Sequence, residues 1–320
     1  MDIDVVFLGT SASAPTARRG TSSLLVRHGG DRLLFDCGEG TQRQLLRSSI
    51  GLIDLEQIFL THLHADHYLG LPGMLKTFSL RMRETPLTVY GPAGLDDLFV
   101  ALKRVFGRLT YPVELVELRA GEALERDGYR VLTFPVSHGI AAVGYALVEE
   151  ERPGRFDPDE AKRLGVAEGP AFAALQRGEE VAGSDGPVRP KDVMGEARPG
   201  RIVAITGDTS PCHSTVAAAA DADLLIHDAS FSEEEVQRAA DTGHSTVGQA
   251  AAVAREAHVK LLALVHISSR YHVGTVLDEA REVFEDCVAP KDFDLIEIPF
   301  PEKDLPKLIA NGARENGESG

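Results

Sequence analysis

The chain has 320 residues, of which 43% are hydrophobic and 26% are charged, as is typical of a globular protein. Its formal net charge of −16 argues against indiscriminate nucleic-acid binding, because an acidic surface repels a polyanion. No apolar run approaches the roughly 20 residues of a membrane-spanning helix, the acidic first residues do not fit a signal peptide, and the three cysteines are too scattered for a disulfide framework. We therefore expect a cytoplasmic protein without membrane association.

The N-terminal segment predicts a strand over residues 4–9, a loop of small residues, and a hairpin formed by residues 22–26 and 32–35. A short helix over residues 41–48, capped by Thr41, is expected next. The hydroxyls of Thr10 and Ser11 and the bare amides of glycines 38 and 40 either hold phosphate oxygens or simply make tight turns.

The most informative stretch is residues 61–67, which directly follow the apolar run 58–60. It contains four candidate metal ligands, namely His62, His64, Asp66 and His67. Imidazoles suit zinc and similar cations, while a carboxylate either binds a metal or acts as a base beside it. His62 and His64 can share one ion, and the adjacent pair Asp66 and His67 can serve a second. The spacing therefore predicts a site for two metals.

Downstream, an amphipathic segment over residues 74–83, a strand over 87–90 and a helix over 94–106 follow. A strand, a loop with ligands, a helix and a strand are typical of a layered α/β protein. His138 comes just after another strand-like run, residues 130–136. A lone histidine is more often structural than a ligand, but a site with three histidines needs such a partner.

Residues 151–201 differ in character, since they contain six of the 17 prolines and no long apolar period. They predict an excursion from the core with one helix, residues 159–164, and a turn at Gly169 and Pro170. A disordered linker is the alternative. A small folded unit is favoured by four apolar side chains: Phe156, Leu164, Phe172 and Leu175.

In the last third of the chain, apolar strands end three times on acidic or ligand-type residues. Residues 202–206 precede Asp208, residues 223–226 precede Asp228, and residues 259–265 precede His266. Sites in open α/β sheets are built where strands end, so Asp208 can bridge two metals and His266 can complete the second site. His244 is either part of the cap of a helix over residues 246–257 or a catalytic acid.

The charges are unevenly distributed. Residues 1–110 carry 12 Lys or Arg against 11 Asp or Glu, so the acidic excess lies in the rest of the chain. This part contains clusters at Arg18 and Arg19, at Arg43 and Arg47, and further downstream. The clusters either admit a polyanion or are ordinary solvated faces.

These motifs resemble those of the ribonuclease Z family, tRNA 3′-end processing enzymes of the metallo-β-lactamase superfamily, over almost the whole chain. The residues 62–67 are shared with the whole superfamily. More specific segments are residues 7–11, 35–39, 70–73 and 266–271. Pro153-Gly154 and Gly169-Pro170 resemble the protruding arm with which the family grips the tRNA elbow. The family's Ser-Arg-Ser stretch is missing near residues 74–79, which leaves cleavage before or after CCA open.

The resemblance implies an α/β fold, the metallo-β-lactamase αββα sandwich with a protruding arm. Residues 1–150 and 201–310 would together form one domain, with residues 151–200 as the inserted substrate-binding arm and residues 311–320 as a disordered tail. It also implies two Zn²⁺ per subunit, with Mn²⁺ or Co²⁺ as substitutes. One ion would bind His62, His64 and His138, the other Asp66, His67 and His266, and Asp208 would bridge them.

The roles implied for the catalytic residues follow the same pattern. Asp66 would orient and deprotonate the attacking water, and His244 would protonate the leaving 3′ oxygen. Asp228, where the family usually has Glu, would hydrogen-bond to His244. Substrate contacts are expected at six residues: Ser268, Arg270, Thr10, Ser11, Gly169 and Pro170.

The expected function is a zinc-dependent endoribonuclease, working as a homodimer, that removes the 3′ trailer from precursor tRNA and leaves a tRNA 3′-hydroxyl. One alternative is a hydrolase of small phosphodiesters or other small esters on the same fold, although a small substrate gives no reason for a folded arm. Another is a non-catalytic RNA-binding protein, which would be expected to lose ligands, whereas all seven ligand positions are filled.

Overall fold

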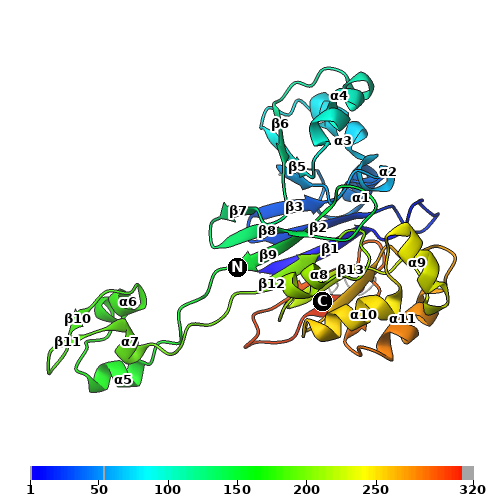
Figure 1. Ribbon diagram of the computed structural model, residues 1–320. Helices are drawn as coiled ribbons and strands as arrows, with labels where there is room; N and C mark the ends of the chain where they lie inside the picture. The colour runs from blue at the N-terminus through cyan, green and yellow to red at the C-terminus, as the bar shows by residue number, and fades with distance from the viewer. Residues whose placement is uncertain (1, 53–54, 312–320) are drawn as a thin grey trace, which may run out of the picture. The chain divides into compact units, whose positions relative to one another are not determined.

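The computed structural model describes residues 2–52 and 55–311 (Figure 1). The chain divides into two compact units. The larger contains the residues up to Arg126, residues 130–148 and the residues from Arg201 onwards, while the smaller contains residues 127–129 and 149–200. No described helix has the length and apolar character needed to cross a membrane. The disordered tail predicted over residues 311–320 lies, apart from its first residue, outside the described residues.

The first sheet of the larger unit has the strand order β17-β16-β1-β2-β3-β4-β5-β6. Strands β17 to β3 in this order pair antiparallel, and β3 to β6 pair parallel. The strands are β1 (Ile3–Gly9), β2 (Ser23–His28), β3 (Asp31–Phe35), β4 (Gln57–Phe59), β5 (Leu87–Gly91), β6 (Val113–Glu117), β16 (Leu295–Ile298) and β17 (Lys307–Ile309).

The second sheet has the order β15-β14-β13-β12-β9-β8-β7. Strands β12 to β15 pair parallel, and β9 pairs antiparallel with β12. The strands are β7 (Ala123–Arg126), β8 (Tyr129–Pro135), β9 (Val143–Glu149), β12 (Ile202–Ile205), β13 (Leu224–Asp228), β14 (Leu262–Val265) and β15 (Cys287–Val288).

The two sheets face each other through aromatic side chains. Tyr145 of β9 contacts Phe35 of β3 and Phe59 of β4, with ring centroids 5.4 and 5.5 Å apart. Its hydroxyl donates a hydrogen bond to the backbone oxygen of Leu60 at 2.8 Å. Because a buried phenol needs such a partner, the contact fixes one sheet against the other just before the ligand-bearing loop.

Helices cover the outer face of each sheet in Figure 1. Helices α1 (Thr41–Arg47), α3 (Leu71–Leu80) and α4 (Leu95–Phe106) share a core with the first sheet, and α2 (Ala65–Tyr68) carries candidate ligands. Helices α8 (His213–Ala218), α10 (Val247–Glu256) and α11 (Val273–Arg281) share a second core with the second sheet; η1 (Glu233–Glu235) and α9 (Val236–Thr242) precede α10. The predicted αββα sandwich is confirmed.

Two local expectations are wrong. Helix α1 is not capped by Thr41, because Gly40 takes the cap position in the left-handed region at φ 86°, and the Thr41 hydroxyl donates to the Gly38 oxygen instead. Helix α3 begins at Leu71, ahead of the segment expected from residue 74. Pro72 lies in its first turn, where a missing backbone N–H costs no helical hydrogen bond.

The smaller unit has its own core, formed by Ala161, Val166, Leu175, Val188 and Val193. Around this core lie α5 (Pro158–Arg163), α6 (Pro170–Gln176), α7 (Pro190–Val193), β10 (Val181–Ala182) and β11 (Pro187–Val188). The two chain segments that connect this unit to the rest of the protein pair with each other. The backbone N–H of Arg152 and that of Arg198 each donate to the other residue's backbone oxygen at 2.8 Å.

Candidate metal centre

The candidate ligands lie in loops that follow strands of both sheets. In the first sheet's half, His62 and His64 follow β4, and Asp66 and His67 belong to α2. The loop is anchored at Thr61, whose backbone N–H donates to Asp36 Oδ1 at 2.8 Å. In the second sheet, three loops supply the rest: His138 follows β8, Asp208 follows β12 and His266 follows β14.

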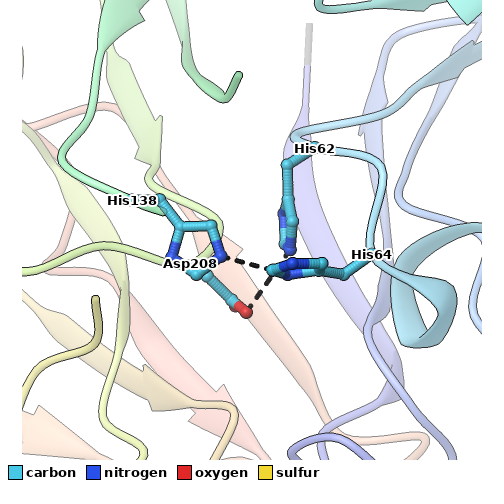
Figure 2. A group of neighbouring side chains, drawn as sticks. All are labelled: His62, His64, His138 and Asp208. Carbon is cyan, nitrogen blue, oxygen red and sulfur yellow. Dashed lines mark hydrogen bonds and ion pairs between the residues drawn. The ribbon is translucent and has the colours of Figure 1, made fainter. Parts of the chain in front are cut away.

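One group of donors comprises His62, His64, His138 and Asp208, and Figure 2 shows the four side chains converging. One donor atom from each lies within 4.8 Å of the others. His138 Nε2 is 3.1 Å from His64 Nδ1, and His62 Nε2 is 3.5 Å from Asp208 Oδ2. Residues separated by up to 146 positions thus offer nitrogen and oxygen atoms to one point.

A second group comprises Asp66, His67 and His266. Asp66 Oδ2 lies 3.2 Å from His266 Nε2 and 3.6 Å from His67 Nε2. Asp208 joins the two groups, because its Oδ2 lies 3.3 Å from His67 Nε2 and 3.5 Å from both His62 Nε2 and His266 Nε2. This is where a carboxylate must lie to serve both groups.

The unpartnered nitrogens fit a cation better than a hydrogen-bond network. The Nε2 atoms of His62 and His67 are buried, and neither makes a hydrogen bond among the described residues. Burial lowers the pKa of His62 well below its usual value, a shift that the charge of His67 reinforces, so the ring is neutral and Nε2 presents a lone pair. Donors of this kind, with carboxylates beside them, are the set that Zn²⁺ prefers.

The other ring nitrogen of most candidate ligands already has a partner. This fixes the tautomer and directs Nε2 towards the cluster, as the outer contacts of metal-binding histidines commonly do. The pairs are His62 Nδ1 with Thr61 Oγ1 at 3.1 Å, His67 Nδ1 with Asp36 Oδ2 at 2.7 Å, His138 Nδ1 with the Gly243 oxygen at 2.8 Å, and His266 Nδ1 with Ser230 Oγ at 2.9 Å. These partners were not predicted from the sequence. Asp36 could have been predicted, because it directly follows strand β3 just as several candidate ligands follow their strands.

His244, which is half-buried, pairs with the buried Asp228 beside the cluster. His244 Nδ1 lies 2.8 Å from Asp228 Oδ2, and its ring stacks against that of His266 at 5.4 Å. Burial lowers the pKa of His244, but the hydrogen bond and the charge of Asp228 outweigh burial and raise the pKa to about 9. His244 therefore carries a proton at neutral pH.

The alternative that His244 caps the following helix is wrong. Helix α10 is capped by Thr246, whose hydroxyl accepts from the N–H of Gln249 at 3.2 Å, while Gln249 Oε1 accepts from the N–H of Thr246 at 3.0 Å. The side chain of His244 is thus available for chemistry.

The residues predicted to contact the substrate are in different situations. Thr10 and Ser11 are buried, and their hydroxyls donate to Asp292 Oδ1 at 2.9 Å and to the Ala14 oxygen at 2.8 Å. Arg270 is exposed beyond β14 and forms an ion pair with Glu235 at 3.0 Å, with Ser268 accepting from its Nε at 3.3 Å. Gly169 and Pro170 lie at the start of α6 in the smaller unit. The substrate contacts stay predictions.

Comparison with known proteins gives concordant results. The family model of the metallo-beta-lactamase superfamily matches residues 16–263. The chain is 44% identical over 300 residues to a ribonuclease Z of Methanosarcina acetivorans, covering 92% of this chain and 98% of that protein. It is 47% identical over 304 residues to a ribonuclease Z of Myxococcus xanthus, with coverages of 94% and 98%. The crystal structure of the short form of human tRNase Z superposes with a TM-score of 0.66 at 29% identity, covering 92% of this chain and 99% of that one.

Proposed function

Because the chain belongs to the ribonuclease Z family of the metallo-β-lactamase superfamily, we propose that it is a metal-dependent endoribonuclease that removes the 3′ trailer from precursor tRNA. The observation that carries the proposal is the convergence of seven ligand-type side chains at one point of a chain that matches these relatives over more than nine-tenths of its length. The predicted product is a tRNA with a 3′-hydroxyl.

The donor set supports two divalent cations per subunit, with zinc as the first candidate. His62, His64 and His138 would hold one, Asp66, His67 and His266 the other, and Asp208 would be shared. When bound, such a pair of cations lowers the pKa of water and neutralises negative charge on the phosphoryl oxygens. The lowered pKa of His62 and the Nε2 atoms of His62 and His67, which make no hydrogen bond among the described residues, support this assignment.

The remaining chemistry belongs to the protein's own side chains. As the oxygen of water bonds to phosphorus and the bond from phosphorus to O3′ breaks, the Asp66 carboxylate takes the proton of the water. Neighbouring His266 and His67 outweigh the effect of burial and hold the pKa of Asp66 below its ordinary value, so the carboxylate is ionised and ready to accept. His244 would donate the proton that O3′ requires, and Asp228 would keep His244 protonated and oriented.

We assign the smaller unit to recognition of the tRNA body. Gly169 and Pro170 are the residues proposed for this contact. Gly169 has φ 102°, and the space where a side chain would begin is open, with no atom within 4 Å of that point. A separate folded unit of this size favours a macromolecular substrate over the small esters of the alternative function.

The deciding experiment is cleavage of a 3′-extended precursor tRNA, made once with and once without an encoded CCA, with the product ends mapped at single-nucleotide resolution. One cut at the end of the acceptor stem supports the proposal, and its position shows which 3′ end is made. No cut, with bound metal and continued hydrolysis of bis(p-nitrophenyl) phosphate, would favour the small-substrate hydrolase.

The homodimer and the cytoplasmic location stay predictions. Family resemblance supports the dimer. Sedimentation equilibrium of the full chain at micromolar concentration measures it directly, and a mass of one chain of 34.4 kDa would contradict it.

A further inference from the structure

Three consecutive glutamates form η1, and their side chains are in different situations. Glu233 Oε1 accepts from a backbone N–H in the first turn of α10 at 2.9 Å, so this residue has a structural role. The side chain of Glu234 is exposed and has no ion pair or hydrogen bond in the part of the chain that the structure describes. Glu235 is less exposed than its two neighbours and forms ion pairs with two arginines.

Glu235 holds Arg270 through both of its carboxylate oxygens. Arg270 Nη1 donates to Glu235 Oε1 at 3.1 Å, and Arg270 Nη2 lies 3.0 Å from Glu235 Oε2. The guanidinium also donates to two hydroxyls, from Nε to Ser268 and from Nη2 to Tyr271, both at 3.3 Å. Every nitrogen of this guanidinium thus has an acceptor, and a phosphate that takes paired N–H groups must displace one of them. Of these acceptors, Glu235 carries the negative charge that competes directly with phosphate.

Arg270 lies at the edge of the candidate metal centre. It belongs to the loop that begins with the candidate ligand His266. Its Cζ is 5.7 Å from the centre of the Phe231 ring, and that ring is 6.0 Å from the ring of His244. The side chain of Arg270 is 44% exposed, so it is open to a polyanion from outside. A phosphate taken by Arg270 would therefore lie close to the bond that is cleaved.

Glu235 keeps a second partner when Arg270 turns to a phosphate. Arg238 Nη1 donates to Glu235 Oε1 at 3.3 Å, from the next turn of the chain. The Arg238 guanidinium also lies over the ring of Phe231, with its Cζ 5.9 Å from the ring centre. Ion pairs between partly exposed side chains contribute little to stability. Moving Arg270 from Glu235 to a phosphate is therefore a small step in free energy, as exchange between two competing partners requires.

We propose that Glu235 competes with a phosphodiester group of the RNA substrate for Arg270, and thereby lowers both the affinity of the site for RNA and the salt dependence of binding. The inference rests on the proposed function and on the predicted contact of Arg270 with the substrate, and it adds the role of Glu235. In the native protein, salt weakens both the ion pair and the contact that replaces it, so the two effects oppose each other. A single RNA phosphate gains little at this site, so stable binding needs the further contacts that a precursor tRNA provides.

The first test compares Glu235→Gln with Glu234→Gln. Each change removes one negative charge from η1, but only the first frees Arg270. For Glu235→Gln, KM for precursor tRNA should fall about threefold, the size expected when an ion pair between partly exposed groups is lost. The slope of log KM against log salt should become steeper by about one, because one phosphate contact regains its full salt dependence. Equal KM and equal slope for the two variants would overturn the inference.

The second test asks whether Glu235 acts through Arg270. Arg270→Gln should raise KM, and adding Glu235→Gln to it should change KM no more than adding Glu234→Gln does, because the residue for which Glu235 competes is gone. A threefold fall in KM in the Arg270→Gln background would show that Glu235 acts on RNA by its charge alone. A rise in KM for Glu235→Gln by itself would show that Glu235 positions Arg270 for the substrate. Either result would overturn the proposed competition.

These experiments distinguish failure of the inference from failure of the proposed function. If the native protein cleaves precursor tRNA and Glu235→Gln behaves as Glu234→Gln, the inference alone fails. If the native protein hydrolyses bis(p-nitrophenyl) phosphate but not precursor tRNA, the proposed function fails and this inference fails with it. Thermal melting checks the fold of each variant. If Glu235→Gln is destabilised, Glu235→Ala and its control Glu234→Ala provide the same comparison.

Discussion

At the scale of single residues, four imidazoles of the candidate metal centre, those of His62, His67, His138 and His266, have their Nδ1 atom held by the protein and their Nε2 atom turned towards the cluster. The pair formed by His67 and Asp36, at 2.7 Å, shows how this works, because a buried carboxylate fixes the proton on Nδ1. The consequence is that the ligands are oriented before any cation arrives. Asp66 differs from these imidazoles because it is ionised and partly exposed, so its carboxylate is able to take a proton.

Asp66→Ala should lower kcat for precursor tRNA by at least a hundredfold, since a positioned base commonly contributes that much. The check is kcat together with metal content by mass spectrometry. The variant His213→Ala, in an exposed stretch at the start of α8, is a control that should keep kcat. More than a few per cent of native activity with a full complement of metal would contradict the role of Asp66.

Asp228→Asn should shift the pH dependence. His244 donates its proton only below its pKa, which Asp228 raises to about 9, so native activity should persist to about that pH. Removing the negative charge lowers the pKa, so the alkaline limb of the kcat profile should move to lower pH by about one unit or more, with a larger loss at pH 8 than at pH 6. The variant Asp228→Glu keeps the charge and should keep the limb. Parallel profiles for all three proteins would contradict the pairing.

A leaving-group experiment addresses His244 itself. His244→Ala should reduce cleavage of precursor tRNA by roughly a hundredfold or more, because O3′ is a poor leaving group without a proton. The loss should be much smaller for bis(p-nitrophenyl) phosphate, whose nitrophenolate leaves without protonation. Equal losses on both substrates would argue for a structural role.

At the scale of elements, prolines organise the smaller unit. Its three helices start with Pro158, Pro170 and Pro190, each in the first turn, where proline restricts φ and no helical hydrogen bond is lost. Asp157 caps the first of them by accepting from the N–H groups of Asp159 and Glu160 at 3.0 and 2.9 Å. The same residues that break the apolar pattern of the sequence therefore begin helices.

Replacing residues 154–196 with a short Gly-Ser turn should test the role of this unit. Because the backbones of Arg152 and Arg198 already pair with each other, a short turn can connect the two chain segments after the replacement. We expect kcat/KM for precursor tRNA to fall by at least tenfold. Hydrolysis of bis(p-nitrophenyl) phosphate should continue, because this small ester lacks the tRNA body that the unit is proposed to bind. Loss of both activities together would mean that the unit is needed for folding, and retention of both would refute its role in tRNA recognition.

The sequence predicted the elements that carry the site better than their exact ends. Apolar strands followed by ligand-type residues located His62, Asp208 and His266, since buried strands have a strong pattern and sites form where they end. The cap of α1 was missed because Gly40, rather than a hydroxyl residue, adopts the left-handed conformation there. The partners Asp36 and Ser230 were missed because tertiary packing across 31 and 36 positions brings them to their histidines.

At the scale of the whole molecule, the side chains of the candidate metal centre come from both halves of the sandwich. His62 and His67 lie beside the first sheet, while Asp208 and His266 follow strands of the second. A ligand that binds only the folded state stabilises it, and here it would also join the two sheets.

Removal of metal should therefore lower thermal stability. Dialysis against a chelator is expected to lower Tm by roughly 5–15 °C, the shift that a few kcal/mol of linkage produces in a protein of this size, and added Zn²⁺ should restore it. The His266→Ala variant, which lacks one ligand, should show a smaller shift. An unchanged Tm after verified loss of metal would contradict the assignment of a cation to this cluster.

The order of the ligands along the chain has a consequence for synthesis on the ribosome. His62 is made early and His266 late, so at about 5–20 residues per second the cluster stays incomplete for roughly 10–40 s after its first member is translated. A chain that stops short of His266 lacks a donor of the second group and the strand that positions it. Prematurely terminated products should thus be inert towards cellular RNA, a safeguard that a site confined to residues 62–138 would not provide.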